Sequence, residues 1–209
     1  METEARTMSV AGNSSPRDPD KIAEIFRAAA RIFNTKGFHA TSINEIADAV
    51  HLTKAGLYYY IQGKQDLLYR IMDYAMDALE GEVIQPAESI ADPEERLRAI
   101  VAGHANLITQ AGVHELTILV NELEGLSPEQ RRQITERQAH YVDLVRETID
   151  TLKARGRVHD VDSTVGAFGL LGMILWVPRW FDAKGRLSSQ EVADQLTELA
   201  LRGLLREPA

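Results

Sequence analysis

Apolar side chains first recur at helical spacing shortly after residue 20. Intervals of three and four residues place side chains on one face of an α-helix. The positions that follow this spacing are Ile22, Ile25, Phe26, Ala29 and Phe33. The pattern stops at Gly37, and glycine is favoured just beyond a helix end. The sequence therefore predicts a first helix that ends at Gly37.

Two short helices joined by a tight turn are predicted next. Ser42 and Glu45 form a capping box, in which each side chain binds a backbone N–H that the first helical turn leaves free. Thr53 is suited to cap the second of these helices, which runs to about Tyr60. Two short helices around a turn at residues 50–53 have the dimensions of a helix-turn-helix. The second helix of such a unit lies in the major groove of DNA.

Longer helices fill the rest of the chain. Apolar positions at helical spacing run from Lys64 to Leu79, and Gly81 and Pro86 are expected to end that helix. Further helices are predicted over residues 93–108, 116–123, 128–156, 162–181 and 189–204. No segment of useful length alternates between apolar and polar residues, which is the strand pattern. The chain is therefore predicted to be all-α, with about nine helices.

Composition excludes several classes of protein. The 209 residues include no cysteine, which leaves no disulfide, thiolate zinc site or thiol switch. The first ten residues carry acids and no apolar block, so we expect a cytoplasmic protein without a secretory signal. The longest apolar stretch, residues 165–177, is shorter than the roughly 18 residues of a membrane span. No membrane partner is expected.

Charge is divided unevenly along the chain. Lysine and arginine number 23, and aspartate and glutamate number 31, for a net charge of −8. Residues 21–64 hold six of the bases and three of the acids, a local charge of +3, so the remainder carries −11. A basic segment on an acidic chain suggests a small module that binds nucleic acid.

Motifs of catalysis are missing from the sequence. The chain has no Gly-x-Ser-x-Gly elbow, no phosphate-binding loop and no Gly-x-Gly-x-x-Gly segment. Its six histidines show none of the spacings that bind a metal ion on one helix face. We therefore expect no enzyme, no catalytic residue, no metal site and no cofactor.

The expected recognition helix carries side chains suited to DNA. Ala55 is small enough for a close approach to the duplex, Lys54 supplies a positive charge, and tyrosine hydroxyls can reach phosphates. Three consecutive helical residues span about 200°, so at least one of Tyr58, Tyr59 and Tyr60 faces outward. We place two of the three at DNA, the alternative being an aromatic core patch.

The order of residues in this region carries a resemblance. The segment GFHATSINEIA at residues 37–47, followed by LYYYI at 57–61 and Lys64, resembles the DNA-binding domain of the TetR/AcrR transcription regulators. The resemblance implies three N-terminal helices on DNA within residues 18–64, after a polar tail over residues 1–17 that we expect to be flexible. It also implies a helical ligand-binding and dimerisation domain over residues 65–209, with a homodimer formed by the last two helices.

The DNA contacts of the family carry over to matching positions of this chain. With the cap of the recognition helix included, the expected DNA-binding residues are Ser42, Asn44, Thr53, Lys54, Ala55, Tyr58, Tyr59, Tyr60 and Lys64. The resemblance places Lys64, Tyr59 and Tyr60 on phosphates. Asn44 stands where many members have arginine, and His51 stands where the turn usually has glycine. Because a left-handed backbone strains residues other than glycine, we expect strain of about 1 kcal/mol at His51.

A second, less specific resemblance lies farther along the chain. The segments LEGLSPEQRR at 123–132 and LWVPRWF at 175–181 are similar to the acyl-CoA-responsive branch of the same family. That branch controls fatty-acid, sterol or aromatic-acid degradation, so the resemblance implies an acyl-CoA effector. Trp176 and Trp180 are expected on one helix face with Arg179 beside them. An arginine between indoles suits an anionic ligand, and the same residues suit a dimer interface equally well.

Further polar residues on apolar helices are candidates for the effector site. His104 is either a hydrogen-bonded core histidine or a pocket residue, and His114 and Glu115 are weaker candidates of the same kind. The expected ligand-binding residues are His104, Asn121, Glu122, Trp176, Arg179 and Trp180.

Three glycines bear on the expected homodimer. Gly166, Gly169 and Gly172 put small residues along one side of their helix, which permits the close helix approach of an antiparallel four-helix dimer interface. The alternative is that these glycines admit an intramolecular neighbour.

The sequence therefore predicts a dimeric, ligand-responsive transcriptional repressor. It binds a palindromic operator in double-stranded DNA, and a small-molecule effector releases it. The alternative is an all-helical ligand-binding or scaffold protein without sequence-specific DNA binding.

Overall fold

The computed structural model describes residues 18–109 and 113–206, with only the backbone given for residues 113–115. The tail expected over residues 1–17 lies outside the described residues, and so do the side chains of His114 and Glu115. Within the described ranges the chain consists of helices joined by turns and loops, which confirms the predicted all-α class.

The first helix, α1 (Pro19–Lys36), buries the apolar face that its spacing predicted. Its buried residues are Ile25, Phe26, Ala29, Ala30 and Phe33. The carboxylate of Asp18 accepts a hydrogen bond from the N–H of Asp20 at 3.0 Å and so caps the helix start. Gly37 has a φ of 84°, a left-handed value that glycine adopts without strain, and the helix ends there as predicted.

The next two helices, α2 (Ile43–Ala49) and α3 (Lys54–Tyr60), form the expected helix-turn-helix. The hydroxyl of Thr53 accepts from the N–H of Gly56 at 3.0 Å, so the predicted cap of α3 is present. Between the helices His51 has a φ of 54°, the one left-handed residue other than glycine in the described chain. The predicted strained turn is therefore confirmed.

The fourth helix is longer than the sequence predicted. It consists of α4 (Lys64–Leu79), a π-helical turn η1 (Glu80–Ile84) and α5 (Gln85–Glu88). The prediction that Gly81 and Pro86 end the helix is therefore wrong. A proline has no N–H and clashes with the carbonyl four residues back, but the wider π turn accommodates Pro86 without a break. Val83, Ile84 and Ala87 are buried. Packing against the core therefore stabilises the continuous helical rod formed by α4, η1 and α5, where the local sequence would favour a helix end.

The remaining helices follow the predicted order. They are α6 (Pro93–Thr109), α7 (Val113–Asn121), α8 (Pro128–Ala154), α9 (Ser163–Trp176) and α10 (Ser189–Leu204), with short 3-10 turns η2 (Leu123–Gly125) and η3 (Val177–Arg179). The helix expected over residues 162–181 ends early, at Trp176. Pro178 has no N–H for the carbonyl of Ile174, which accepts instead from Val177. With α4, η1 and α5 taken as one rod, the described residues hold the nine predicted helices.

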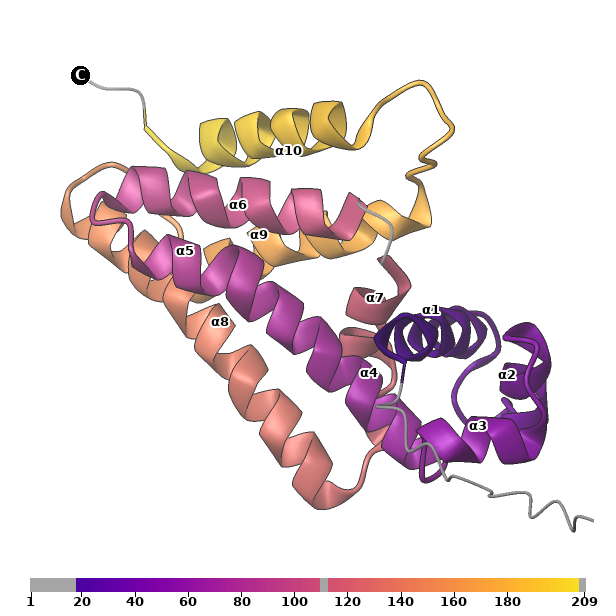
Figure 1. Ribbon diagram of the computed structural model, residues 1–209. Coiled ribbons are helices and arrows are strands. Elements are labelled where there is room, and N and C mark those ends of the chain that lie inside the picture. The colour runs from indigo at the N-terminus through magenta and orange to yellow at the C-terminus, as the bar shows by residue number, and fades with distance from the viewer. Residues whose placement is uncertain (1–17, 110–112, 207–209) are drawn as a thin grey trace, which may run out of the picture.

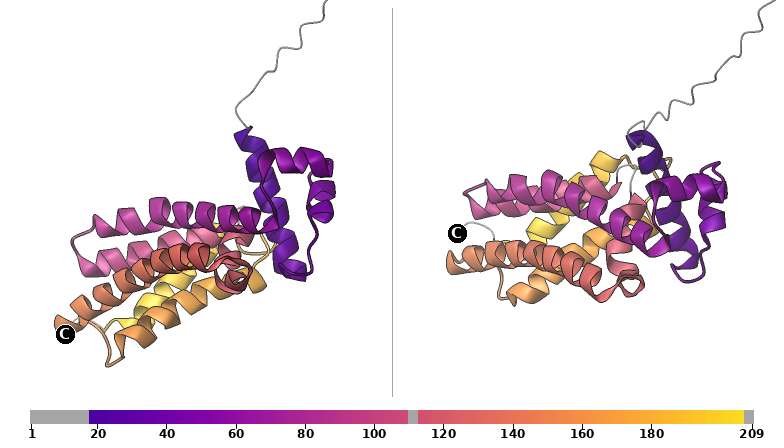
Figure 2. Two further views of the ribbon diagram at one scale, coloured as in Figure 1. Left: turned by 90° about the horizontal axis from the view of Figure 1, so that it is seen from below. Right: turned by 60° about the horizontal axis from the view of Figure 1, so that its bottom comes forward.

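The three N-terminal helices gather at one end of the molecule, beside a larger body of long helices (Figures 1 and 2). In that body α10 packs on α6, and α8 packs on both α6 and α9. α7 packs against α1 and α4, so it joins the N-terminal helices to the body. No helix in the described part of the chain has the length and apolar character needed to cross a bilayer.

Candidate DNA interface and effector cavity

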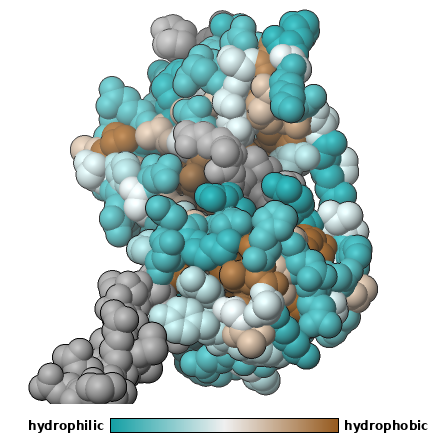
Figure 3. Space-filling model, turned by 45° about the vertical axis from the view of Figure 1, so that its right-hand side comes forward, coloured by the Kyte–Doolittle hydropathy of each residue, from teal (hydrophilic) through white to brown (hydrophobic). Residues whose placement is uncertain are grey.

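Most of the residues predicted to contact DNA lie on the outer side of α2, the turn and α3. Leu57 is buried and anchors α3 to the other N-terminal helices. The predicted DNA-binding residues that are exposed are Ser42, Asn44, Thr53, Lys54, Ala55, Tyr58 and Tyr59. The structure therefore brings these residues together on one small unit, and their contact with DNA stays a prediction. The molecular face that includes this end is mostly hydrophilic, with smaller hydrophobic areas (Figure 3).

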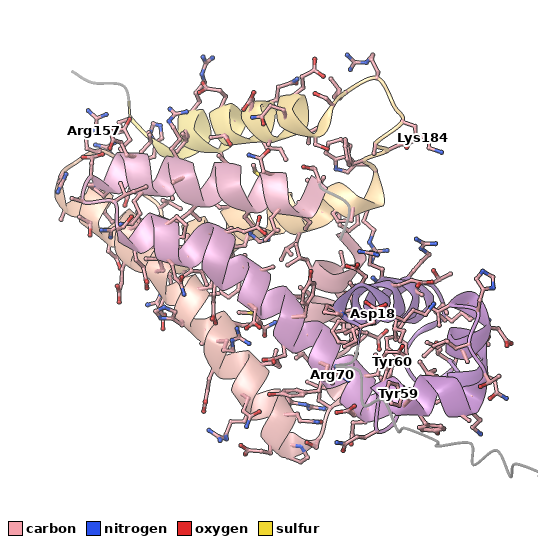
Figure 4. The ribbon with its side chains drawn as sticks, viewed as in Figure 1. Asp18, Tyr59, Tyr60, Arg70, Arg157 and Lys184 are labelled. Atoms are coloured by element: carbon pink, nitrogen blue, oxygen red, sulfur yellow. The ribbon has the colours of Figure 1, made fainter. Side chains whose placement is uncertain are left out.

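The three consecutive tyrosines divide between surface and interior. Tyr58 is 45% exposed and Tyr59 is 52% exposed, whereas Tyr60 is half-buried. The ring of Tyr60 lies edge-on to that of Tyr59, with 5.1 Å between centroids, and its carbonyl accepts from Arg70 at 2.6 Å at the junction of α3 and α4 (Figure 4). Two of the three tyrosines are therefore available to a duplex.

The start of α2 is fixed by a network that uses the Ser42 hydroxyl. Ser42 and Glu45 form the predicted capping box, with the Ser42 N–H donating to the Glu45 carboxylate at 2.8 Å. The hydrogen bond from Lys36, followed by those from Ser42, lowers the pKa of Glu45 from 4.5 to about 2. The carboxylate therefore stays charged at neutral pH, and the network holds α2 at a fixed angle to α1.

Lys64, which the resemblance places on a phosphate, has close partners inside the protein. Its ammonium donates to the carbonyls of Phe38 and Thr41 at 2.8 Å each and to that of His39 at 3.3 Å. It also lies 4.5 Å from the centroid of the Phe38 ring. An ammonium has three N–H donors, and these carbonyls engage all of them. The phosphate contact stays a prediction, while the geometry gives Lys64 a structural role between α4 and the α1–α2 loop.

Further hydrogen bonds attach the N-terminal helices to the body. Asn34 on α1 donates to the hydroxyl of Thr117 on α7 at 2.7 Å, and the N–H of Phe38 donates to the Glu122 carboxylate at 3.2 Å. The predicted ligand residue Glu122 thus contacts the loop between α1 and α2. A Cβ on Gly125 would lie 2.6 Å and 2.7 Å from side-chain atoms of Leu68 and Phe38, so only glycine fits at this joint. Movement in the body therefore reaches α1 through short, specific contacts.

An apolar cavity of about 340 Å³ lies between the helices of the body, and two side chains of its lining, Val120 and Phe168, are also exposed to solvent. Its walls come from α4, α6, α7, α8, α9 and η2, and its apolar lining includes Met76, Leu79, Leu116, Leu119, Val142, Phe168, Leu171 and Leu175. The polar side chains in this lining are His104, Tyr141 and Gln138. A largely apolar enclosure with a few polar groups is the common form of a small-molecule site.

His104 and Tyr141 form a buried pair in this cavity. Nδ1 of His104 lies 3.0 Å from the Tyr141 hydroxyl oxygen. Burial lowers the pKa of His104 from 6.5 to about 4, and burial raises the pKa of Tyr141 above its ordinary value. The pair is therefore neutral, with one N–H and one O–H between its members. Since one of these hydrogens joins the pair, the other is available to an acceptor on a ligand.

The histidine was a sequence candidate, but the tyrosine was not. Tyr141 lies 37 residues from His104 on the apolar stripe of α8, where spacing marks it as a core residue. No local pattern could have joined the two, because their proximity follows from the packing of α6 on α8.

A second hollow, of about 510 Å³, lies between the end of α1 and the α7, α9 and η3 segments of the body. Its lining includes the predicted ligand residues Asn121, Trp176 and Arg179. The Arg179 guanidinium lies 5.7 Å from the centroid of the Trp176 ring. Asn34 and Thr35 at the end of α1 complete the opposite wall. These two residues were not candidates from the sequence, because nothing local marks them as facing a hollow.

Trp180 does not join this group. The expectation that both tryptophans flank Arg179 on one helix face is wrong, since α9 ends at Trp176 and the chain turns through η3. Trp180 instead lines an open groove on α10 with Leu196, Leu199 and Arg202. The proline that breaks the helix thus separates the two indoles.

Two family models match this chain. The model described as the C-terminal domain of tetracyclin-repressor-like proteins matches residues 91–204. The model of bacterial regulatory proteins of the tetR family matches residues 25–71, which include the helix-turn-helix.

Known proteins resemble the chain over most of its length. AibR, in its crystal structure in complex with isovaleryl coenzyme A and operator DNA, has 40% sequence identity to this chain. The TM-score is 0.75, and the match covers 86% of this chain and 97% of that one. PfmR, a TetR family transcriptional regulator from Thermus thermophilus, is 31% identical with a TM-score of 0.73, over 87% and 99% of the two chains. The transcriptional repressor KstR2 of Mycobacterium tuberculosis is 24% identical over 88% of this chain and 92% of its own.

The structural role of Lys64 predicts a loss of stability on substitution. Lys64→Met keeps a similar side-chain length but leaves the carbonyls of Phe38 and Thr41 without their donor. We expect the free energy of unfolding to fall by about 1–3 kcal/mol, the usual cost of such a loss. Urea denaturation followed by circular dichroism measures the change.

Lys54→Met serves as the matched control, because Lys54 is exposed on α3. We expect this variant to stay within about 0.5 kcal/mol of the unaltered protein. If both methionine variants are equally stable, the structural role of Lys64 is wrong.

The buried histidine predicts a loss of stability on acidification. The folded pKa of His104 is about 4, below its ordinary 6.5, so between these values the unfolded chain binds a proton that the folded chain does not. Stability from this group is therefore full above pH 6.5 and is lost as the pH falls towards 4, by up to about 3 kcal/mol. His104→Gln should show a shallower pH dependence than the unaltered protein, measured by urea denaturation at pH 7, 5.5 and 4.

The exposed His159 provides a control for this measurement. His159→Gln should retain the pH dependence of the unaltered protein. Parallel curves for His104→Gln and the unaltered protein would contradict the prediction.

Proposed function

Because the chain belongs to the TetR family of bacterial regulatory proteins, which are transcription regulators and not enzymes, we propose that it is a ligand-responsive repressor. In this proposal a homodimer binds a palindromic operator, and an acyl-CoA thioester releases it. The observation that carries the proposal is the presence, in one chain, of an exposed helix-turn-helix and an apolar cavity that contains one neutral donor pair.

The proposed DNA contact is made by α3 in a major groove. The exposed residues Lys54, Ala55 and Tyr58 lie within the first five positions of this helix, and the N-terminal part of a recognition helix is the part that contacts base edges. Asn44 near the start of α2 is exposed beside it. The net charge of +3 over residues 21–64 supports attraction to phosphates.

The proposed dimer is formed by α9 and α10. An exposed stripe runs along α9 through Val165, Phe168, Gly169, Gly172 and Trp176, at the spacing of one helix face. Large exposed apolar side chains in a stripe mark an interaction surface. On α10 Leu199 is 64% exposed, and Trp180 beside it is 50% exposed.

The glycines of α9 divide between the two roles that the sequence left open. A Cβ on Gly166 would lie 3.1 Å from Ile149 and 3.7 Å from Leu204, so this glycine serves packing within the chain. A Cβ on Gly169 or on Gly172 would meet nothing within 4 Å. These two glycines therefore support the close approach of a partner helix in an antiparallel four-helix interface.

The proposed effector fits the chemistry of the cavity. An acyl chain suits the apolar walls, and a thioester carbonyl suits the single hydrogen that the His104–Tyr141 pair can donate. The relative AibR, at 40% identity, binds isovaleryl coenzyme A and operator DNA. This likeness supports a short branched acyl chain as the first effector to test.

Release follows from a shift between conformations that exist before the ligand binds. The two recognition helices of a dimer must match successive major grooves, roughly 34–36 Å apart. Since α1 packs on α7 and is joined to it by the hydrogen bond from Asn34 to Thr117, an effector that moves α7 changes this separation.

Tyr58 tests the DNA half of the proposal. Tyr58→Ala should reduce the ratio of operator to random-sequence affinity by roughly 5- to 150-fold, because a base contact contributes about 1–3 kcal/mol of discrimination. Fluorescence anisotropy measures both affinities at two salt concentrations, with DNA from the region upstream of the gene that encodes this chain.

The matched control is Tyr74→Ala, since Tyr74 on α4 is exposed to a similar extent, 51%. It should leave the ratio unchanged. If both alanine variants lose the same discrimination, the assignment of α3 is wrong; if the unaltered protein binds no DNA at either salt concentration, the scaffold alternative replaces the repressor.

Isovaleryl coenzyme A tests the effector half. Saturating thioester should weaken operator binding by about 5- to 150-fold, the range of a typical allosteric coupling. The double variant His104→Phe, Tyr141→Phe should keep operator binding and lose the response, because it removes both members of the donor pair from the cavity. Titration of the protein–operator complex by anisotropy measures both.

A panel of thioesters with longer acyl chains accompanies this titration. If none of them changes operator binding, the acyl-CoA effector is wrong while the repressor stands.

A further inference from the structure

The apolar cavity and the hollow beside α1 are neighbours with shared walls. Val120, Gly172 and Leu175 line both. The lining of the cavity is mostly apolar. The hollow lies between the end of α1 on one side and α7, α9 and η3 on the other, and its lining contains more polar side chains. An elongated molecule can therefore place an apolar end in the first and a polar arm in the second.

The side chains of this second hollow, which we call the polar cleft, suit an arm with amides and phosphates. Its polar lining consists of Asn34, Thr35, Thr117, Asn121 and Arg179. Asparagine and threonine side chains both donate and accept hydrogen bonds, as a chain of amide groups requires. The rim adds the indole of Trp176, 63% exposed, on which a flat ring can stack.

Arg179 gives the polar cleft its anion-binding character. No carboxylate of the described residues lies within ion-pair distance of its guanidinium, which instead lies 5.7 Å from the centroid of the Trp176 ring. A guanidinium binds phosphate through two parallel hydrogen bonds, and stacking on an indole leaves its N–H edge free for them.

We propose that the polar cleft binds the phosphate-bearing arm of a coenzyme A thioester whose acyl group occupies the apolar cavity, with Arg179 on a phosphate and α1 in direct contact with the arm. This inference rests on the proposed acyl-CoA effector and adds where its nucleotide end lies and what that end does.

Because the arm contacts α1, it is the part of the effector that changes DNA binding. Asn34 and Thr35 belong to the last turn of α1, the helix on which α2 packs. The hydrogen bond from Asn34 to Thr117, 2.7 Å long, crosses the junction that the polar cleft occupies. An arm bound between these helices separates α1 from α7, and α2 and α3 move with α1.

The opposite wall distinguishes this site from the proposed dimer face. Trp176 ends the exposed stripe of α9, but Asn34 and Thr35 lie on α1, outside the surface formed by α9 and α10. A partner subunit that packs on the stripe would therefore cover only the rim of the polar cleft at Trp176. Dimer formation does not explain why the opposite wall of the polar cleft is polar.

Two probes separate the arm from the acyl group. Isovaleryl coenzyme A carries both, and isovaleryl-N-acetylcysteamine carries the same thioester without nucleotide or phosphate. In the unaltered protein we expect calorimetry to show binding of both and anisotropy to show operator release by the first alone. Arg179→Ala should weaken binding of isovaleryl coenzyme A by about tenfold to a hundredfold, the cost of a charge-assisted hydrogen bond, and leave the affinity for the truncated thioester unchanged.

Matched variants complete the design. Lys184→Ala removes the same charge from the loop before α10, at the outer edge of the molecule (Figure 4), and should behave as the unaltered protein. Arg179→Lys retains a positive charge and should recover part of the affinity. Sedimentation of each variant checks that the dimer is intact.

The remaining possible outcomes each contradict one part of the proposal. Equal weakening of both thioesters by Arg179→Ala, no weakening of either, or operator release by the truncated thioester would overturn the polar-cleft assignment and leave the proposed effector standing. If the unaltered protein binds neither thioester, the proposed effector fails and the arm with it. Binding of free coenzyme A as tightly as the thioester would show that the polar cleft takes the nucleotide without the acyl group, which overturns the two-part site.

Discussion

The attachment of α1 to the start of α4 and to α7 is the constraint on which the rest of the molecule depends. The Lys64 ammonium engages three carbonyls of the loop that follows α1, and Gly125 has no room for any side chain against Leu68 and Phe38. These contacts are close and leave little free space, so a displacement of the body reaches the loop that follows α1. The three N-terminal helices are attached to the body through these contacts, and their position is therefore set by the body.

The body combines a buried polar pair with apolar walls. Desolvation keeps His104 neutral, with its pKa lowered to about 4, and the pair with Tyr141 supplies one hydrogen to a cavity whose walls are mostly apolar. A charged group there would require a partner of opposite charge, and it would reject a neutral acyl chain. The π turn at residues 80–84 lies in the same rod that lines this cavity, and Arg137 on α8 pairs with Asp73, Asp77 and Glu80 along it. The wall of the cavity is thus tied to α8 by charge as well as by packing.

The surface divides in the same way as the interior. The N-terminal segment is basic and the remainder is acidic, a division that favours approach of the N-terminal helices to DNA in the proposed complex. The exposed apolar stripe of α9 is the exception on this acidic surface. Its glycines at positions 169 and 172 have open space in front of them, which suits the partner helix of the proposed dimer.

Local sequence determined the helices, their caps and the face that each one buries. The capping box predicted at Ser42 formed, because a cap depends on residues three positions apart, and the same kind of cap starts α8 at Ser127 and α10 at Ser188. The strained turn at His51 followed in the same way, since its conformation is set by the two helices that it joins. The helix-turn-helix and the set of exposed residues on it could therefore be read from the chain alone.

Tertiary structure decided the features that depend on distant residues. Core packing carried the rod past Pro86, and the break at Pro178 separated Trp180 from Trp176 and Arg179. The partners of Lys64 lie more than 20 positions away, and those of His104 and Asn34 lie 37 and 83 positions away. Spacing in a sequence reports only which side chains share a helix face, whereas a cavity, a cleft or a joint is made by faces of different helices. The sequence determined the parts, and the packing of one helix on another decided which of them meet.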